Sequence, residues 1–443
     1  MRVRIIGGGV AGLSCALALR LRAGIDDVQV FEREPCAEVM DRAGHGLLLM
    51  QNGAHALRRL AVAHLLQGCT ALSHAMLQDK RGVVMRTNKL RDVYCITRAA
   101  LVDGLRAGLP PGTIAFDRRC TGVEFAPASR GACVRAVHFA SGPPLLGDAV
   151  DMFVGADGWR SPLRSALNPT LQHPASRVKE IVTSTRLPRL AARLRSCFVK
   201  TILPDQGAAF GLLAPTGTRV IGFLQFDSDR YKPPAPSATA ADIRHFLDDV
   251  LSGAPEPVPT YLRHADLETA HLWEPVNADI PARLHCDNAV LVGDAAHPLL
   301  PFTSQGAGAA LEDSIILADA MRSVGAERQL VSASLDGSLA RSLARFCDAR
   351  RREVAVYIEG GRRILANFLD PSSGVTLPYV DGAVSGLGER PGPPRARLTR
   401  RLQARGSNGD SHSGHDEPRD GSRRSGWRPP APGSASSSAG ALR

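Results

Sequence analysis

The sequence is poor in aromatic side chains and has no apolar run long enough to cross a membrane. Aromatic residues make up 5% of the 443 positions, which leaves few surfaces on which nucleic-acid bases could stack. No stretch of about 18 uncharged apolar residues occurs, so we expect no membrane span. The chain starts directly with an apolar segment and shows no signal or transit peptide. These absences predict a cytoplasmic protein that has no membrane span and binds no nucleic acid.

Cysteine is present, but its spacing suits neither metal binding nor redox exchange. None of the nine cysteines forms a C-x-x-C pair, which argues against a zinc site and against a thioredoxin-like redox pair. Their odd number in a chain of this length indicates reduced thiols. We therefore expect no bound metal.

The excess of positive charge is concentrated at the C-terminus. The formal net charge is +11, and residues 389–443 contribute +6 of it through eleven arginines and five acidic residues. From about residue 385 the composition shifts to Gly, Pro, Ser and Arg, which is typical of segments that cannot build a core. We predict a disordered basic tail over 385–443. A contact between this tail and an acidic surface or nucleic acid is the alternative.

The first thirty residues have the pattern of a βαβ unit. Arg2 to Ile6 reads as a buried strand, Val10 to Ala23 as a helix, and Val28 to Phe31 as the next strand. Gly24 stands where a helix should end. This order predicts a parallel sheet with a right-handed crossover, and hence an α/β fold.

The rest of the chain alternates between β-rich and helical regions. Short apolar runs separated by Pro and Gly in 82–93 and 177–225 predict antiparallel strands of a second sheet. A strand is expected at 288–292, and helices are expected at 241–251, 306–321 and 335–368. We predict a discontinuous dinucleotide-binding domain (1–70, 97–175 and 286–335), a substrate domain (71–96 and 176–285), a C-terminal helical segment (336–384) and the tail.

A glycine-rich loop joins the first strand to the first helix. Gly7, Gly9 and Gly12 form G-x-G-x-x-G, and Glu32 follows 20 residues after Gly12 at the end of the next strand. In such loops the first glycine permits a tight turn, the second admits a pyrophosphate, and the third lets helix and strand pack closely. Glu32 would accept hydrogen bonds from ribose hydroxyls, which favours FAD or NAD over NADP. A glycine-rich turn without a ligand is the alternative.

Two later motifs restrict the choice of dinucleotide. The first is VGADGWRSPLR, which begins at Val154, and the second is LVGDAAHP, which begins at Leu291 and is followed by Pro301 and Gln305-Gly-Ala-Gly. Asp294 ends a strand, where open α/β sheets place their ligands, although capping of the next turn would also suit it. These motifs, in this order after the glycine loop, resemble the para-hydroxybenzoate hydroxylase family of FAD-dependent monooxygenases, which includes salicylate and urate hydroxylase-like enzymes. The resemblance covers roughly residues 1–370.

The resemblance implies a fold, a cofactor and a set of FAD contacts. The fold is a Rossmann-like FAD-binding domain of the GR2 type with an antiparallel substrate sheet and C-terminal helices. Pro301 would lie beside the isoalloxazine ring and shape the face that reacts with oxygen. Gly306, Ala307 and Gly308 would present N–H groups to the pyrimidine edge of the flavin. The other implied contacts are Gly7, Gly9, Val10, Ala11, Gly12, Glu32, Arg33, Arg42, Gly44, Arg98, Asp157, Gly158, Gly293 and Asp294.

Several of these residues have other interpretations. Each arginine could be a solvated surface charge, and Asp157 could cap a helix. Arg164, on the helix after Asp157, could meet a phosphate. His45 is the candidate catalytic base, and it could equally be a plain polar residue or a point of covalent flavin attachment. Tyr231 and Tyr261 fall in the substrate region, where a tyrosine is more often part of the packing.

The reaction implied by the resemblance is hydroxylation of a small aromatic or heterocyclic molecule. NADH or NADPH would bind transiently and reduce FAD, and O2 would react through a flavin C4a-hydroperoxide. No second G-x-G-x-x-G is present, which fits a transient donor. A halogenase would carry W-x-W-x-I-P, which is absent. The alternatives are a halogenase-like flavoprotein, a flavin reductase or dehydrogenase without hydroxylation, and a non-catalytic FAD-binding protein. A homodimer is the assembly left open.

Overall fold

The computed structural model describes residues 1–38, 46–126, 133–172, 174–330 and 335–370. All of them belong to the unit Met1–Gly388, which is one of two compact units of the chain. The predicted tail, and with it the boundary at about residue 385, lies outside the described residues.

The first sheet is built around the predicted βαβ unit. Strands β1 (Val3–Ile6) and β2 (Val28–Phe31) pair in parallel, and α1 (Val10–Ala23) connects them. Gly24 ends the helix in the left-handed conformation at φ 66°, as expected. The strand order is β16-β17-β10-β1-β2-β6, and its pairs are parallel except for the antiparallel pair β16–β17. The other members are β6 (Ile114–Ala115), β10 (Met152–Gly155), β16 (His285–Cys286) and β17 (Ala289–Leu291).

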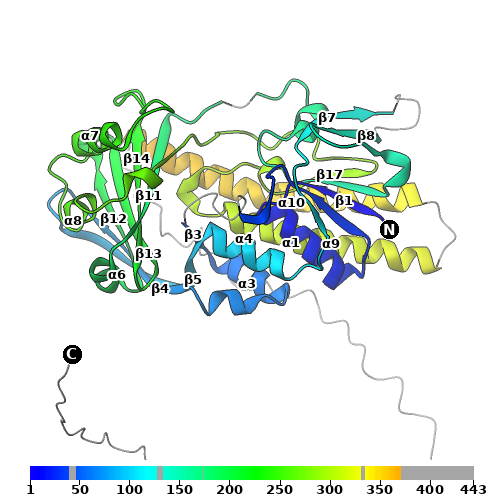
Figure 1. Cartoon of the computed structure of the whole chain (residues 1–443), viewed down its shortest axis with the longest axis horizontal. Coiled ribbons are helices and arrows are strands. Elements are labelled where there is room, and N and C mark those ends of the chain that lie inside the picture. The colour runs from blue at the N-terminus through cyan, green and yellow to red at the C-terminus, as the bar shows by residue number, and fades with distance from the viewer. Residues whose placement is uncertain (39–45, 127–132, 173, 331–334, 371–443) are drawn as a thin grey trace, which may run out of the picture. The chain divides into compact units, whose positions relative to one another are not determined.

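Helices and a small third sheet surround the first sheet (Figure 1). Helix α1 packs against α9 (Gly306–Leu330), which also contacts α3 (Gln51–Arg59) and α10 (Leu335–Leu369). The apolar side chains of these elements and of the sheet form one continuous core. The remaining elements are α4 (Arg98–Ala107), α5 (Pro162–Leu167), and the third-sheet strands β7 (Cys120–Phe125), β8 (Val134–Phe139) and β9 (Leu145–Leu146).

The second sheet has eight strands in the order β15-β11-β14-β13-β12-β4-β5-β3. Its neighbours pair antiparallel, as predicted, except for β12 and β4, which are parallel. That pair joins segments more than a hundred residues apart, so no local turn signal announces it and the expectation of a purely antiparallel sheet is wrong there. The strands are β3 (Gly46–Leu49), β4 (Thr70–Gln78), β5 (Val84–Thr97), β11 (Val178–Arg186), β12 (Cys197–Leu203), β13 (Ala208–Thr216), β14 (Arg219–Asp227) and β15 (His271–Trp273).

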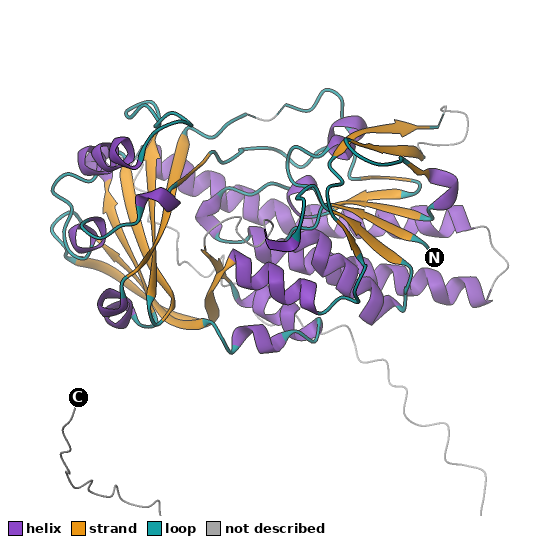
Figure 2. Cartoon of the chain, in the orientation of Figure 1, coloured by secondary structure: helices purple, strands orange, loops and turns teal. Residues whose placement is uncertain are grey.

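The two faces of the second sheet have different surroundings. Three helices cover one face and share a second apolar core with it: α6 (Pro188–Leu194), α7 (Ala240–Val250) and α8 (Val258–Leu262) (Figure 2). The other face carries a smaller apolar cluster. Single turns of 3-10 helix connect several elements: η1 (Ala63–Leu66), η2 (Gly147–Ala149), η3 (Pro204–Gln206), η4 (Leu267–Thr269), η5 (Gly293–Ala295) and η6 (Pro301–Thr303).

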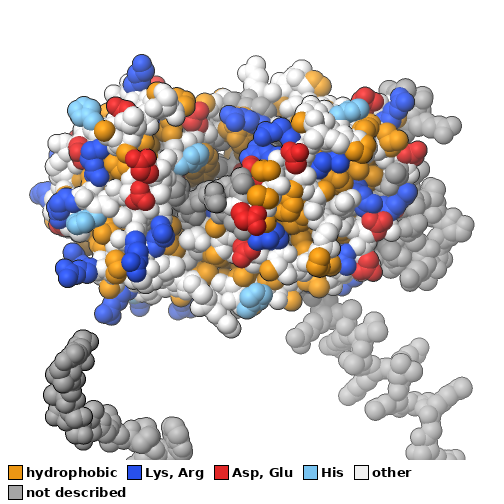
Figure 3. Space-filling model, viewed as in Figure 1, with side chains coloured by type: hydrophobic (Ala, Val, Ile, Leu, Met, Phe, Trp, Pro, Cys, Tyr) orange, Lys and Arg blue, Asp and Glu red, His pale blue; other side chains and the backbone are white. Residues whose placement is uncertain are grey.

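Charged side chains of both signs are spread over the surface shown in Figure 3, on the part with β11–β14 and on the part with β1. Among the described residues no helix is long and apolar enough to span a membrane.

Candidate functional site

A cavity of about 680 Å³ connects the carboxyl ends of the first-sheet strands with the second sheet. Ligands of open α/β sheets bind outside these strand ends, so the position agrees with the sequence prediction. The predicted site residues that line the cavity are Gly7, Gly9, Val10, Ala11, Glu32, Arg33, Arg98, Asp157, Gly158, Asp294, Pro301, Gly306 and Ala307.

The glycine loop forms one end of the cavity. An added Cβ on Gly9 would meet only Arg98 Nη2, at 3.9 Å, so the Gly9 backbone faces open space. Gly12 has the packing role expected of it, because a Cβ there would lie 1.8 Å from the carbonyl oxygen of Gly7. The loop therefore combines tight packing beneath it with an open surface above it, next to the N-terminus of α1.

Glu32 lies at the edge of the glycine loop. Its Oε2 accepts a hydrogen bond from Gly8 N at 2.5 Å, and its Oε1 accepts one from Glu34 N at 3.0 Å. A carboxylate can accept about four hydrogen bonds, so two backbone donors leave capacity for a ligand hydroxyl. The backbone therefore fixes the carboxylate in position for the predicted ribose contact.

Arg98 and Asp294 bring opposite charges to the middle of the cavity. Arg98 begins α4, whose first turn is capped by Thr97 Oγ1, which accepts from Ala100 N at 3.1 Å. Burial lowers the pKa of Arg98, and Glu32 and Asp294 act against this effect. Asp294 is open to the cavity but enclosed by protein, and this enclosure raises the pKa of its carboxyl. No hydrogen bond from a described residue holds the Asp294 carboxyl, so it is available to a ligand.

Asp157 carries a buried oxygen without a partner. Its Oδ1 accepts no hydrogen bond from the described residues, and an orphaned buried acceptor is costly unless a ligand or water satisfies it. Burial raises the pKa of Asp157 to about 6, and a hydrogen bond with Ser161 opposes this shift. Both the orphaned oxygen and the position in the cavity wall indicate a binding role rather than helix capping alone.

Pro301 and the first turn of α9 also line the cavity. The first N–H groups of a helix have no partners within the helix, and those of Gly306 and Ala307 border the cavity. A Cβ on Gly306 would meet nothing within 4 Å, so a ligand can approach its backbone. Gly308 and Gly293, by contrast, do not line the cavity. A Cβ on Gly308 would lie 2.7 Å from Asn52 Oδ1, so this glycine permits the close approach of α3 instead.

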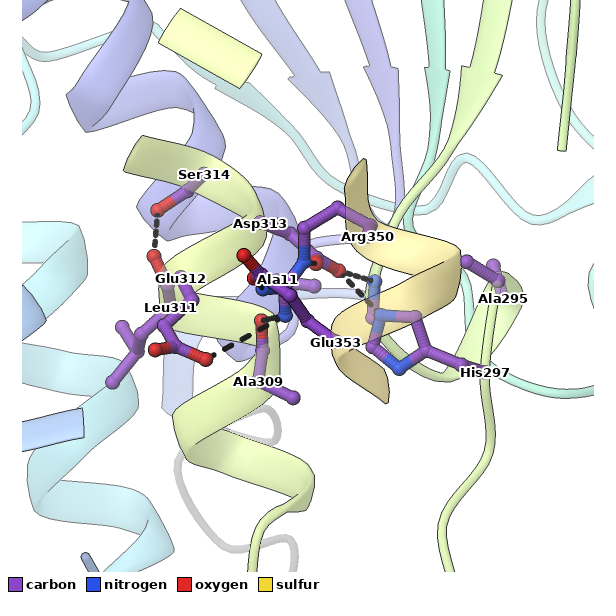
Figure 4. Close-up of polar contacts among 12 residues, drawn as sticks. Ala11, Ala295, His297, Ala309, Leu311, Glu312, Asp313, Ser314, Arg350 and Glu353 are labelled. Carbon is purple, nitrogen blue, oxygen red and sulfur yellow. Dashed lines mark hydrogen bonds and ion pairs between the residues drawn. The ribbon is translucent and has the colours of Figure 1, made fainter. Parts of the chain in front are cut away.

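A buried ionic network holds the segment that carries Asp294 (Figure 4). Asp313 Oδ2 accepts from Gly293 N at 2.7 Å and from His297 Nε2 at 2.8 Å, and its Oδ1 accepts from Arg350 Nε at 2.6 Å. Burial alone would raise the pKa of Asp313, but His297 and Arg350 outweigh it and keep the pKa below its usual value. The network therefore ties α10 to the loop at the cavity, with His297 as one of its buried members.

Arg164 does not reach the cavity, which contradicts the expected phosphate contact. Its side chain is fully buried, and Nη1 donates to the carbonyl oxygens of Ala295 at 2.8 Å and Ala296 at 2.9 Å. Burial lowers the pKa of Arg164 to about 10, and Asp294 opposes this effect. Arg164 therefore supports the segment that carries Asp294 through its backbone carbonyl groups, because α5 directs the side chain into the protein. The sequence alone does not show this direction.

Other predicted positions fall outside the cavity wall or outside the described residues. Tyr261 is packed in the second core, where its hydroxyl lies 2.6 Å from Thr183 Oγ1 and accepts from Gly222 N. Tyr231 packs edge-on against Phe246. The predicted site residues outside the described part of the chain are Arg42, Gly44 and His45.

The second sheet contributes a wall that the sequence predictions missed. Alternate residues of β11 and β14 face the cavity, most of them apolar, together with Glu180 and Gln225. Gln225 Nε2 donates to Glu180 Oε2 at 2.8 Å, and Lys200 Nζ donates to Gln225 Oε1 at 2.6 Å. Burial raises the pKa of Glu180 and lowers that of Lys200, each to about 7. The available signal for this wall was Glu180, a charged residue among the apolar residues of a predicted strand.

The cavity residues fit FAD. Backbone N–H groups of a helix N-terminus and an arginine suit a pyrophosphate, Glu32 suits a ribose, and the orphaned Asp157 oxygen and the open Gly306 backbone await polar groups. No group of three or more His, Cys, Asp or Glu residues that could hold a metal occurs in the described part of the chain.

Comparison with known proteins identifies the family. A model described as an FAD binding domain matches residues 150–332. The 3-amino-4-hydroxybenzoate 2-monooxygenase PtmB3 of Streptomyces platensis is 32% identical over 341 residues, which are 72% of this chain and 78% of that protein. Salicylate hydroxylase of Pseudomonas putida is 27% identical over 391 residues, covering 79% and 82% of the two chains.

A solved structure shows the same fold. HpxO of Klebsiella pneumoniae, in complex with FAD and uric acid, aligns with a TM-score of 0.68 and 21% identity over 87% of this chain and 92% of that chain. The motifs, the cavity and these relatives agree on one conclusion: the chain belongs to the family of FAD-dependent aromatic monooxygenases.

Proposed function

We propose that this enzyme hydroxylates a small, planar aromatic or heterocyclic molecule in the chamber between Pro301 and the second sheet. The observation that carries the proposal is that one cavity is lined by the glycine loop, the start of α9 and an apolar wall of the second sheet. Relatives named for salicylate and for 3-amino-4-hydroxybenzoate support an aromatic substrate. NADH or NADPH is the electron donor, and O2 is the second substrate.

We propose that FAD lies along the cavity with its adenosine end at Glu32 and its ring near Pro301. The glycine loop and Arg98 would hold the pyrophosphate, and Asp294 would bind the ribityl chain. FAD, when bound, supplies the redox chemistry and the reaction with O2. The same division of labour gives the proposed domains, with 1–70, 97–175 and 286–335 holding FAD and 71–96 and 176–285 holding the substrate, although β3 within 1–70 pairs in the second sheet.

The chain's own residues would contribute position, electrostatics and exclusion of water. N–H groups at the start of α9 favour negative charge on the part of the ring that faces them. Apolar side chains of the second sheet keep water away from the reacting carbon, which strengthens every polar interaction inside the chamber. We also propose a cytoplasmic location, which the reduced state expected of the thiols from the sequence supports.

The test is a flavin experiment on the purified protein. Bound flavin is quantified first, and the protein is then reduced anaerobically with NADH or NADPH in the presence of single phenolic, anilinic and heterocyclic compounds. Admission of 18O2 should return oxidised flavin together with a product that contains one labelled oxygen atom. Flavin that is reduced and reoxidised without a labelled product from any compound would favour the reductase alternative.

A further inference from the structure

The chamber wall formed by the second sheet contains a buried carboxyl group, although burial of such a group does not favour folding. Glu180 and Gln225 face the cavity among the apolar side chains Val182, Phe198, Leu213, Ile221 and Phe223. Glu180 is only 7% exposed, and an ionisable group in such surroundings is costly unless it is hydrogen-bonded. A residue of this kind in a cavity wall is a candidate for ligand recognition.

The orientation of this carboxyl follows from its neighbours. Glu180 and Gln225 stand opposite each other on β11 and β14, and Lys200 reaches Gln225 from β12. Lys200 Nζ donates to Oε1 of Gln225, so the amide oxygen of Gln225 faces Lys200. The amide nitrogen must then face Glu180, whose Oε2 accepts from it. The chain Lys200–Gln225–Glu180 therefore leaves Glu180 Oε1 on the side of the cavity, where the ionised carboxylate is an acceptor.

The second oxygen of Glu180 remains for a ligand. No described residue donates a hydrogen bond to Oε1. This atom is not among the buried unpaired atoms of the described part, so it is accessible, and Glu180 lines the cavity. The arginines of the cavity wall (33, 98, 118, 119 and 160) all lie outside the strands of the second sheet, with Arg98 directly after β5. Among described residues, this end of the cavity therefore offers an anionic acceptor without a cation in the wall.

We propose that Glu180, oriented by Gln225 and Lys200, recognises a hydroxyl, amino or ring N–H group of the substrate. The substrate class is therefore phenols, anilines or N–H heterocycles, and not aromatic acids that turn a carboxylate toward this wall. A carboxylate there would face Glu180 in water-poor surroundings and be repelled. This inference rests on the proposed function.

Recognition by an acceptor also assists the reaction. A hydroxyl or amino group that donates to a carboxylate becomes more electron-rich, and so does the ring carbon beside it. The proton is held between the substrate heteroatom and Glu180 Oε1. Burial raises the pKa of Glu180 to about 7, which suits a group that accepts a proton at neutral pH.

The experiment compares, above pH 7 where Glu180 is ionised, three toluenes that carry different polar groups in the para position: 4-methylphenol, 4-methylaniline and 4-methylbenzoate. Binding to the wild-type FAD enzyme is measured from the change in flavin absorbance. We expect the phenol and the aniline to bind at least ~10-fold more tightly than the benzoate, because a hydrogen bond to a charged group is worth roughly this factor or more.

The variant Glu180→Gln gives a sharper test than loss of affinity alone. Its new amide oxygen must accept from Gln225 Nε2, so its NH2 group would point into the cavity and replace the acceptor by a donor. We expect affinity for the phenol to fall about 10- to 100-fold and affinity for the benzoate to rise, so that the order of the probes is reversed. The matched control is Glu274→Gln, because Glu274 pairs with Lys179 at 3.1 Å and does not line the cavity.

The outcomes separate this inference from the proposed function. Equal or tighter binding of the benzoate to the wild type, or no binding of any probe, would overturn the substrate class. An unchanged order of probes in a folded Glu180→Gln enzyme would overturn the role of Glu180. If that variant does not fold, the wild-type order decides alone. Bound FAD and NAD(P)H oxidation, measured in the same samples, report on the proposed function independently.

Discussion

Replacement of Arg350 by methionine should destabilise the enzyme through the network around Asp313. Arg350 is 2% exposed and lies within 4.0 Å of the carboxylates of Asp313, Glu312 and Glu353. Removal of one partner from a buried ion pair costs about 3–5 kcal/mol, because the remaining charge stays buried without compensation. The exposed Arg352 of the same arginine triplet is the matched control, since a surface substitution changes stability by about 0.5 kcal/mol or less.

The expected change in melting temperature follows from the size of the protein. The compact unit Met1–Gly388 should have an unfolding entropy of about 0.8 kcal/mol/K, so a loss of 3–5 kcal/mol lowers Tm by about 4–6 °C. Arg352→Met should lower it by less than about 1 °C. Thermal unfolding is followed by circular dichroism, and release of the flavin is followed by its fluorescence. Both transitions should shift to lower temperature, because Asp313 also accepts a hydrogen bond from Gly293 N next to Asp294.

The reasoning would be refuted if Arg350→Met and Arg352→Met melted at the same temperature. In that case the network would contribute no net stability, and the connection from α10 to the loop at the cavity would not matter to the fold. A loss of stability without any earlier release of flavin would refute only the connection to the cofactor.

Four further predictions concern the cofactor, the buried charges and the tail. Gly9→Val should abolish FAD retention while the apoprotein keeps its circular dichroism spectrum, because the added atoms enter open space; normal flavin content would contradict the pyrophosphate assignment. Asp294→Ala should weaken FAD binding in equilibrium titrations more than it lowers Tm, since no described residue donates to its carboxyl; equal flavin affinity would make Asp294 structural. The raised pKa of Glu180 makes the stability of the wild type fall as pH rises from 4.5 to about 7, and the lowered pKa of Lys200 makes that stability rise again from about 7 to 10.5. The double variant Glu180→Gln/Lys200→Met lacks both groups, so denaturant titrations should show its largest gain in stability over the wild type near pH 7. A gain that does not vary with pH would contradict the buried pair. Truncation after Gly388 should leave flavin content and NAD(P)H oxidation unchanged, and a large loss of either would show that the predicted tail takes part in function.

Local patterns were sufficient for the elements whose residues interact with near neighbours in sequence. The first helix begins at Val10 and ends before Gly24 as predicted, because helical periodicity and a left-handed terminal glycine are both local properties. The glycine loop, Glu32 and Asp294 were also found from spacing, since a dinucleotide site needs certain residue types at the ends of particular strands. They lie together in one cavity as that logic requires.

Side-chain direction could not be obtained in the same way. Arg164 follows the Asp157 motif in sequence, but its helix turns it inward to the carbonyl groups of Ala295 and Ala296. Gly308 belongs to the motif Gln305-Gly-Ala-Gly, yet it allows α3 to approach and does not border the cavity. A motif fixes the residue type, whereas the rotation of the helix decides which partner that residue meets.

The sequence by itself determined the cofactor class and the βαβ core, because both depend on short-range spacing around glycines and strand ends. Only the tertiary structure decided the parallel pairing of β12 with β4 and the meeting of Glu180, Gln225 and Lys200. These three residues come from three strands, and each alone looks like an isolated polar residue in an apolar alternation. Their chemistry arises from register between distant segments, which no local pattern encodes.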